Sequence, residues 1–265
     1  MSDTLTLTWL GQSGFLFHSF ETEIACDLYL SDFCRKKSNL DHTRLTPIPV
    51  QPEKLDFIDN YLITHGHVDH FDPETVEPIM RSNSSTKFWC PPACSAIIEE
   101  YFSEENKRFT LIRSDVECVL TKNIKLLAIP AAHEELERDT DDEYTCYSYL
   151  ILLELEKKAI FFAGDTMPYP EHAEMIKKHI PKDYELTMIL PINGRDKKRA
   201  DLGFKGNMNV AEAITLANDC SAVRLIPCHY GMFALNNIQE AIEHKLFEAF
   251  NGETLILEIN TKVIL

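Results

Sequence analysis

Three histidines and an aspartate fall within six consecutive positions, directly after a short apolar run. Residues 61–64 predict a buried strand, and the pattern H-x-H-x-D-H follows it as His65, His67, Asp69 and His70. Alternate residues of an extended chain point the same way, so His65 and His67 can reach one ion while the other two follow on the turn. Imidazole and carboxylate are ligands for Zn, Mn and Fe. The cluster therefore favours a metal site over a solvated polar turn.

Three later residues complete such a site. His133 follows the predicted strand 124–129, Asp165 follows the strand 159–163, and His229 follows the strand 223–227. Taken singly, each has an ordinary explanation, namely a loop histidine, an N-cap aspartate or a histidine at a strand end. Together they stand in an order that completes a dinuclear site, in which two divalent ions about 3.5–4 Å apart activate water at neutral pH.

The rest of the pattern predicts a mixed α/β chain with a single domain, residues 1–265. Strands are predicted at residues 5–9, 15–18, 24–26, 61–64, 87–90, 124–129, 146–153, 159–163, 186–190, 223–227 and 254–259. Helices are predicted at residues 73–80, 92–101, 171–179 and 238–250, and from Val210 onward with Asn209 as the N-cap. Polar clusters stand at strand ends, where loops on a rigid sheet usually place chemistry.

Charge and composition limit the classes of partner. Of 265 residues 45% are hydrophobic, and the net charge is −16 because 42 acidic residues face 26 lysines and arginines. This field repels nucleic acids and anionic membranes, although a local basic patch can still hold a small anion. The N-terminus carries no signal-like apolar run, and the eight cysteines include no C-x-x-C pair. We therefore expect a cytoplasmic protein with free thiols and a small anionic substrate.

The order of the histidines and aspartates resembles that of the metallo-β-lactamase superfamily. This resemblance implies an αββα sandwich of two similar halves with the metals at one edge. It implies that one metal is held by His65, His67 and His133, that the second is held by Asp69, His70 and His229, and that Asp165 bridges both. Flavodiiron oxygen reductases of this fold usually carry a glutamate in place of His67, so the histidine favours hydrolysis over redox chemistry.

A narrower resemblance is to the L-ascorbate-6-phosphate lactonase branch of the superfamily. It is carried by WLGQSGF, CDLYLSD, ITHGHVDHFD, AGDT, GNM-x-x-x-EA and IPCHYGMF, which begin at residues 9, 26, 63, 163, 206 and 226. It implies a hydrolase that opens the lactone of a phosphorylated sugar acid, such as L-ascorbate 6-phosphate, and it favours Mn. The chain also resembles N-acylphosphatidylethanolamine phospholipase D, so phosphodiester hydrolysis is an alternative. A metal-binding protein without catalysis is a third reading.

Two aspartates near the cluster have further candidate roles. The resemblance places Asp69 beside the water that attacks the substrate, as both a metal ligand and a proton shuttle. Asp72 either accepts a hydrogen bond from a ligand imidazole or caps the helix that begins at Pro73. The sequence leaves both roles of Asp72 open.

A basic loop after the strand 186–190 is the predicted anion-binding element. It contains Arg195, Lys197, Lys198 and Arg199. Arg195 is the leading candidate because the preceding Asn-Gly turn could aim it at the site. Lys205, Asn207 and Tyr230 are further candidates for substrate contact. The alternatives are a solvated charged loop and a packed tyrosine, and a homo-oligomer also stays open.

Overall fold

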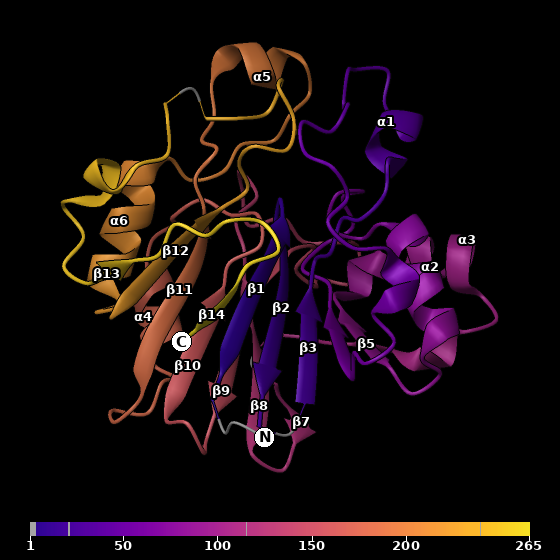
Figure 1. Ribbon diagram of the computed structural model, residues 1–265, viewed down its shortest axis with the longest axis horizontal. Coiled ribbons are helices and arrows are strands. Elements are labelled where there is room, and N and C mark those ends of the chain that lie inside the picture. The colour runs from indigo at the N-terminus through magenta and orange to yellow at the C-terminus, as the bar shows by residue number, and fades with distance from the viewer. Residues whose placement is uncertain (1–3, 21, 115, 239) are drawn as a thin grey trace.

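Two β-sheets stacked face to face form the centre of the molecule (Figure 1). The computed structural model describes residues 4–20, 22–114, 116–238 and 240–265. Among these residues, seven strands form the first sheet in the order β14-β1-β2-β3-β4-β5-β6. They are β1 (Thr6–Gly11), β2 (Gly14–Ser19), β3 (Thr22–Cys26), β4 (Asn60–Leu62), β5 (Lys87–Cys90), β6 (Phe109–Leu111) and β14 (Lys262–Ile264).

The second sheet repeats this architecture with later segments of the chain. In the described part of the chain its order is β13-β12-β11-β10-β9-β8-β7. The strands are β7 (Glu117–Thr121), β8 (Ile124–Pro130), β9 (Tyr147–Leu153), β10 (Lys158–Phe162), β11 (Glu185–Pro191), β12 (Arg224–Cys228) and β13 (Glu253–Thr254). The predicted strands up to residue 227 are confirmed to within one or two residues at each end.

Helices cover the outer face of each sheet. On the first sheet α2 (Pro73–Ser82) and α3 (Ser95–Phe102) pack over an apolar cluster, and on the second α4 (His172–Lys177) and α6 (Val210–Asp219) do the same. Asn209 caps α6 in a capping box, as predicted. The expected αββα sandwich is confirmed. No helix among the described residues has the length and apolar character needed to cross a membrane.

The remaining short helices lie outside the two helical layers or inside connections. They are α1 (Phe33–Lys37), α5 (Lys197–Asp201) and the 3₁₀ turns η1 (Pro52–Lys54), η2 (Pro92–Cys94), η3 (Asn106–Arg108) and η4 (His244–Phe247). Figure 1 places α1 and α5 at the same end of the molecule, beyond the ends of the strands.

Buried apolar side chains from both sheets fill the space between them. The ring of Phe15 in β2 meets that of Phe162 in β10 edge-on, with centroids 6.0 Å apart. The hydroxyl of Tyr149 in β9 donates a 2.7 Å hydrogen bond to the carbonyl of Ile63, which follows β4. This bond joins the second sheet to the segment that carries the histidine cluster.

Strand direction brings the polar clusters to one edge. The strands β3 and β4 are parallel, and so are β10, β11 and β12. Because β8 and β10 are both antiparallel to β9, β8 ends at the same edge as β10. The segments after β8, β10 and β12 therefore emerge together, and the hydrogen bond from Tyr149 to Ile63 brings the end of β4 beside them. Loops at such an edge of a rigid scaffold commonly carry function.

The predicted helix 238–250 is wrong. Its residue 239 lies outside the described residues, and among the others only η4 is helical. The apolar residues Ile238 and Ile242 instead pack against the outer cluster of the second sheet from irregular backbone, and Leu246 does so from η4. Their helical spacing is satisfied by tertiary burial without a helix, because packing overrides local propensity.

The predicted strand 254–259 is also largely wrong. Only its start pairs with the second sheet, in β13, and the amide of Leu255 adds one bond to the carbonyl of Leu225. The chain then crosses to the first sheet, where the amide of Asn260 donates to the carbonyl of Trp9 and β14 pairs with β1. The apolar residues Leu257 and Ile259 contribute to the core between the sheets along this crossing.

One buried histidine in the helical layer affects the stability of the fold. His172 at the start of α4 is 2% exposed and stacks on Tyr169, with ring centroids 4.1 Å apart. Neither ring nitrogen has a hydrogen-bond partner among the described residues. Burial lowers the pKa of His172 to about 3.

We predict that His172→Phe makes the protein less sensitive to acid. His172 is neutral in the folded state down to about pH 3, whereas in the unfolded chain it binds a proton below pH 6.5. The wild type should therefore lose about 2 kcal/mol more unfolding free energy than the variant between pH 7.5 and pH 5. Urea unfolding of both proteins at the two pH values measures this difference. Equal losses in the two proteins would contradict it.

Candidate metal centre

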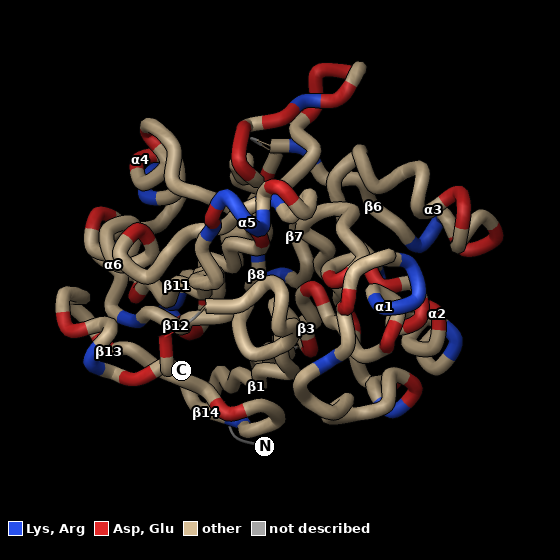
Figure 2. The backbone as a smooth tube through the Cα atoms, turned by 90° about the horizontal axis from the view of Figure 1, so that it is seen from above, with Lys and Arg blue, Asp and Glu red and all other residues tan. Residues whose placement is uncertain are grey.

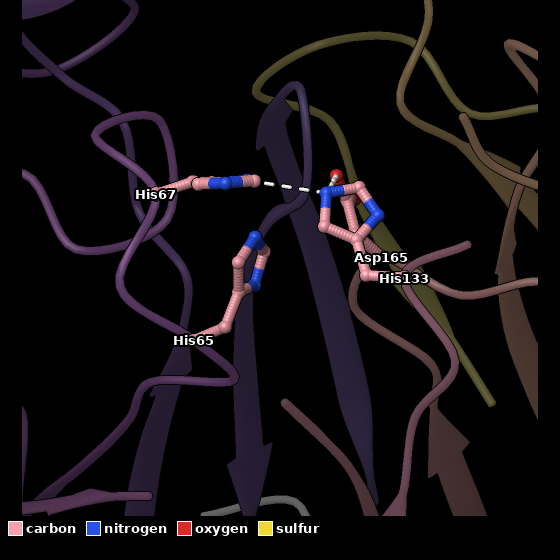
Figure 3. Close-up of side chains that lie close together, drawn as sticks. All are labelled: His65, His67, His133 and Asp165. Carbon is pink, nitrogen blue, oxygen red and sulfur yellow. Dashed lines mark hydrogen bonds and ion pairs between the residues drawn. The ribbon is translucent and has the colours of Figure 1, made fainter. Parts of the chain in front are cut away.

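The seven predicted ligands converge at the shared edge of the two sheets. They form two groups, in each of which one potential ligand atom per residue lies within 4.8 Å of the others. The first group is His65, His67, His133 and Asp165, shown in Figure 3, and the second is Asp69, His70 and His229. The segments after β4, β8, β10 and β12 supply them, so four separate parts of the sequence build the site.

In the first group the imidazole of His65 has a defined tautomer. The Thr64 hydroxyl donates a 2.5 Å hydrogen bond to Asp27, so it can only accept from the Nδ1–H of His65, at 3.0 Å. This leaves the Nε2 lone pair of His65 free. That atom is buried and has no hydrogen-bond partner among the described residues. An unpaired buried lone pair is costly unless a ligand such as a metal ion meets it.

The other two histidines of this group face each other. The Nε2 of His133 lies 3.2 Å from the Nδ1 of His67 and 3.6 Å from Oδ2 of Asp165. Figure 3 shows the three imidazoles and the carboxylate turned toward a common centre. The arrangement of three imidazoles and one carboxylate suits a first-row divalent metal.

Asp165 faces both groups. While its Oδ2 lies near His133, its Oδ1 lies 3.2 Å from Nε2 of His70 and 3.1 Å from Nε2 of His229. Asp69 completes the second group, with its Oδ2 3.6 Å from Nε2 of His229. The position of Asp165 between the groups is that of a bridging carboxylate.

A fully buried aspartate that sequence reasoning missed holds this arrangement. Asp27 follows β3 and accepts hydrogen bonds from the Nδ1 of His70 at 2.7 Å and from the amide and hydroxyl of Thr64. It thereby turns the Nε2 of His70 toward Asp165. The available signal was an aspartate at the end of a predicted strand, within CDLYLSD, the same context that marked Asp165.

Close packing of Gly164 brings the segments after β4 and β10 together. Gly164 has φ +59°, and a Cβ at this position would lie 2.7 Å from the Cβ of Thr64. Only glycine combines this conformation with so close an approach. The A-G-D-T sequence therefore places Asp165 directly beside the segment that carries His65.

Charges at the site match a cation. Burial lowers the pKa of His65 well below its ordinary value, which keeps this imidazole neutral. Burial has the same effect on His229, but the Asp165 and Asp69 carboxylates outweigh it and raise the pKa of His229 to about 9. The carboxylates thus draw positive charge to the centre, and divalent ions can supply it in place of protons. The donor set fits a pair of divalent metals.

Comparison with known proteins decides the family. Residues 30–230 match the family described as the beta-lactamase superfamily domain. The chain belongs to this family.

Relatives at lower identity agree with this assignment. The chain is 25% identical over 237 residues to an uncharacterized protein of Mycobacterium tuberculosis, covering 87% of this chain and 60% of that protein. It is 26% identical over 238 residues to the mitochondrial N-acyl-phosphatidylethanolamine-hydrolyzing phospholipase D of Saccharomyces cerevisiae, covering 86% of this chain and 48% of that enzyme. The chain thus spans less than two thirds of the length of these curated relatives.

Solved structures show the same fold. Igni18, a metallo hydrolase from the archaeon Ignicoccus hospitalis, superposes with a TM-score of 0.69 at 20% identity. The match covers 99% of this chain and 98% of that one.

A second residue of this β-lactamase superfamily site also escaped sequence reasoning. Gln12 lies in the turn between β1 and β2, is 1% exposed and has φ +51°. Its side-chain amide donates to Oδ2 of Asp69 at 2.8 Å and lies 3.1 Å from Nε2 of His229. Its carbonyl accepts from the indole of Trp9 and the amide of His229. The turn is thus fixed to the strand end that carries His229.

Asp72 takes the helix-capping role. Its side chain accepts from the amide of Glu74 at 3.0 Å and from the hydroxyl of Thr75 at 2.5 Å, at the start of α2. The alternative role, acceptor for a ligand imidazole, is filled by Asp27 on His70.

Beside the metal ligands lies a cavity of about 420 Å³. Four ligands, His67, Asp69, His133 and Asp165, form one side of it. Of the four predicted substrate contacts, Lys205 lines this cavity.

The other three predicted contacts are placed elsewhere. Arg195 forms a bidentate ion pair with Glu212, at 2.7 and 2.6 Å, and also donates to the carbonyl of Asn207. Asn207 is fully buried and donates to Asn193. Tyr230 packs against Trp9, with ring centroids 5.0 Å apart. The structure does not bring these three side chains together with Lys205 at the cavity.

We predict that Gln12→Met weakens the second metal position. The variant removes the N–H donor to Asp69 without adding a charge, so the group of Asp69, His70 and His229 loses its positioning contact. Affinity for a second Mn should fall roughly 10- to 100-fold while the first ion is retained. Equilibrium dialysis with elemental analysis measures this, with Gln51→Met, the same substitution at an exposed position, as the control. Two ions bound to Gln12→Met with wild-type affinity would refute the positioning role.

Proposed function

We propose that this chain is a dinuclear metal-dependent hydrolase acting on a small anionic substrate. The observation that carries the proposal is Asp165, whose two oxygens face two separate groups of ligand atoms beside one cavity. Family membership and the fold support the same reading. Bound divalent ions would activate water and polarise the scissile bond.

The protein side chains prepare this chemistry. Asp27 and Thr64 fix the orientation of His70 and His65, so the ligand nitrogens require no rearrangement. Asp69 is the more exposed of the two carboxylate ligands, at 18% against 6% for Asp165. It also lines the cavity, so we assign it the proton transfer from water to the leaving oxygen.

The cavity lining supports an anionic substrate. Its acidic residues are Asp69 and Asp165, both candidate metal ligands, and its lysines are Lys37 and Lys205. Two divalent ions would offset both carboxylates and leave net positive charge. Figure 2, viewed from this end of the molecule, shows basic residues at α1 and α5 with acidic residues beside them. Lys205 itself pairs with Glu137. In a chain with a net charge of −16, the positive charge that favours capture of an anion would therefore come mainly from the bound ions.

The proposed reaction is opening of the lactone of a phosphorylated sugar acid, with Mn as the metal. Water adds to the lactone carbon, the ring C–O bond breaks, and the leaving oxygen takes a proton. The resulting carboxylic acid ionises, so each turnover releases one proton at neutral pH. The motifs shared with the L-ascorbate-6-phosphate lactonase branch support this substrate.

Phosphodiester hydrolysis is the second candidate. The yeast relative is a phospholipase D that hydrolyses an N-acyl phospholipid. The same ligand set could serve that reaction, since bound divalent ions would polarise either a carbonyl or a phosphoryl oxygen. A binding protein without catalysis is disfavoured because all seven ligand positions are occupied by metal-binding residue types.

We expect the Mn-loaded protein to release protons from L-ascorbate 6-phosphate, and Asp165→Ala to lower this rate by about 1,000-fold or more because the metal pair loses its shared ligand. The exposed Asp183→Ala is the matched control and should keep wild-type activity. A phosphodiester and an unphosphorylated lactone are assayed in parallel. Cleavage of the phosphodiester alone would transfer the proposal to the second candidate, and undiminished turnover by Asp165→Ala would overturn the dinuclear mechanism.

A further inference from the structure

The cavity has an apolar wall beside the metal ligands. Leu40, Leu202, Phe204 and Phe233 form it. They come from the segments after α1, after α5 and after β12, none of which belongs to a sheet. These segments meet at the end of the molecule where Figure 1 places α1 and α5, and the one after β12 also carries the candidate ligand His229.

Aromatic contacts hold this wall in place. The imidazole of His42 packs against Phe204 and Phe233, with centroids 5.4 and 5.2 Å away. Phe233 is only 2% exposed and packs on Tyr29. Leu202, by contrast, keeps 41% of its surface exposed, so a ligand that covers it removes apolar area from water. A rigid aromatic surface is suited to the flat face of a ring.

One of the two lysines of the cavity lies directly beside this wall. Lys205 follows Phe204, and its ammonium pairs with Glu137 at 2.7 Å. The next amide, of Gly206, donates to Glu134 at 3.0 Å. Both acids belong to the segment directly after His133, so the metal-bearing chain fixes the loop that carries Lys205. The other lysine of the cavity, Lys37, lies over the rings of Phe33 and Tyr101.

We propose that the substrate is a compact cyclic anion, with a flat apolar face against Phe204 and Leu202 and one phosphate or carboxylate group at Lys205. This inference rests on the proposed hydrolase function and assigns recognition of the ring and of the anionic group to named residues of the cavity. The volume of about 420 Å³ is at the small end of the range for ligand cavities, roughly 300–1,000 Å³. A phospholipid with long acyl chains does not fit inside it.

An open-chain polyol also matches the cavity poorly. Beyond the metal ligands and the two lysines, its polar side chains are Ser38, His42 and Asn236, with Cys34 a weak partner. Asn236 already accepts from Asn193 and Arg199. Hydroxyl groups buried against the apolar wall would lose water without gaining a partner. A ring that presents its hydroxyls at the edge and its face to the wall avoids this cost.

Two lactones of the same ring separate the contributions of the wall and the lysine. We would assay Mn-loaded protein on neutral 3,4-dihydrocoumarin and on its 6-carboxylate. Phe204→Ala should raise KM for both compounds by about tenfold because both lose the ring contact. Lys205→Met should raise KM about tenfold for the carboxylate and leave KM for the neutral lactone unchanged. Leu155→Ala and Lys157→Met, exposed positions away from the cavity, are the matched controls.

Binding gives a second readout that does not require turnover. Calorimetry should compare the ring-opened product of neutral 3,4-dihydrocoumarin with gluconate, an acyclic hydroxyl-rich anion of the same charge. The aromatic product should bind the Mn-loaded wild type at least tenfold more tightly. Phe204→Ala should abolish this preference. The inference is wrong if the two anions bind equally, or if neither Phe204→Ala nor Lys205→Met changes KM. In either case, measured hydrolysis of a lactone would still support the proposed function. If no compound is hydrolysed by the Mn-loaded protein, the proposed function fails, and the binding preference alone then decides whether the cavity selects cyclic anions.

Discussion

The metal centre depends on one buried carboxylate, Asp27, which orients a ligand in each of the two groups. It accepts directly from His70, and through the hydroxyl of Thr64 it fixes the tautomer of His65. Thr64 in turn packs against Gly164, so the same contact places Asp165 between the groups. Three strand ends, those of β3, β4 and β10, are therefore held by a small set of hydrogen bonds and one glycine. These contacts stabilise the arrangement in which the seven ligand side chains lie together at a buried edge.

The two sheets position the site, and burial of its charged and polar side chains is the main unfavourable contribution to its free energy. Two carboxylates and four histidines of the centre are almost fully or largely buried, where unpaired polar groups are unfavourable. Burial lowers the pKa of His65 and keeps its imidazole neutral, whereas Asp165 and Asp69 raise the pKa of His229. Divalent cations would balance the charge of these two carboxylates. With both metals bound, the same charges would make the cavity of this acidic chain cationic. Its only acidic lining residues among those described are ligands that the metals would neutralise.

Much of this could be predicted from sequence because strand ends and metal-binding residue types coincide. His133, Asp165 and His229 each follow an apolar strand, and parallel strand directions bring them together. Gln12 could not be assigned in this way, since its role depends on a turn that packs beside His229. Arg195 shows the opposite problem. Its basic loop was visible, but its pairing with Glu212 is a tertiary contact that a single sequence does not encode locally. The helix predicted at residues 238–250 was wrong for the same reason. Its apolar residues are buried against the second sheet without forming that helix.

Anomalous diffraction from crystals grown with Mn tests the central claim most directly. The account predicts two ions per chain, about 3.5–4 Å apart. One should be held by His65, His67 and His133, the other by Asp69, His70 and His229, with Asp165 between them. A single ion at full occupancy, or two ions that do not share Asp165, would contradict the dinuclear centre.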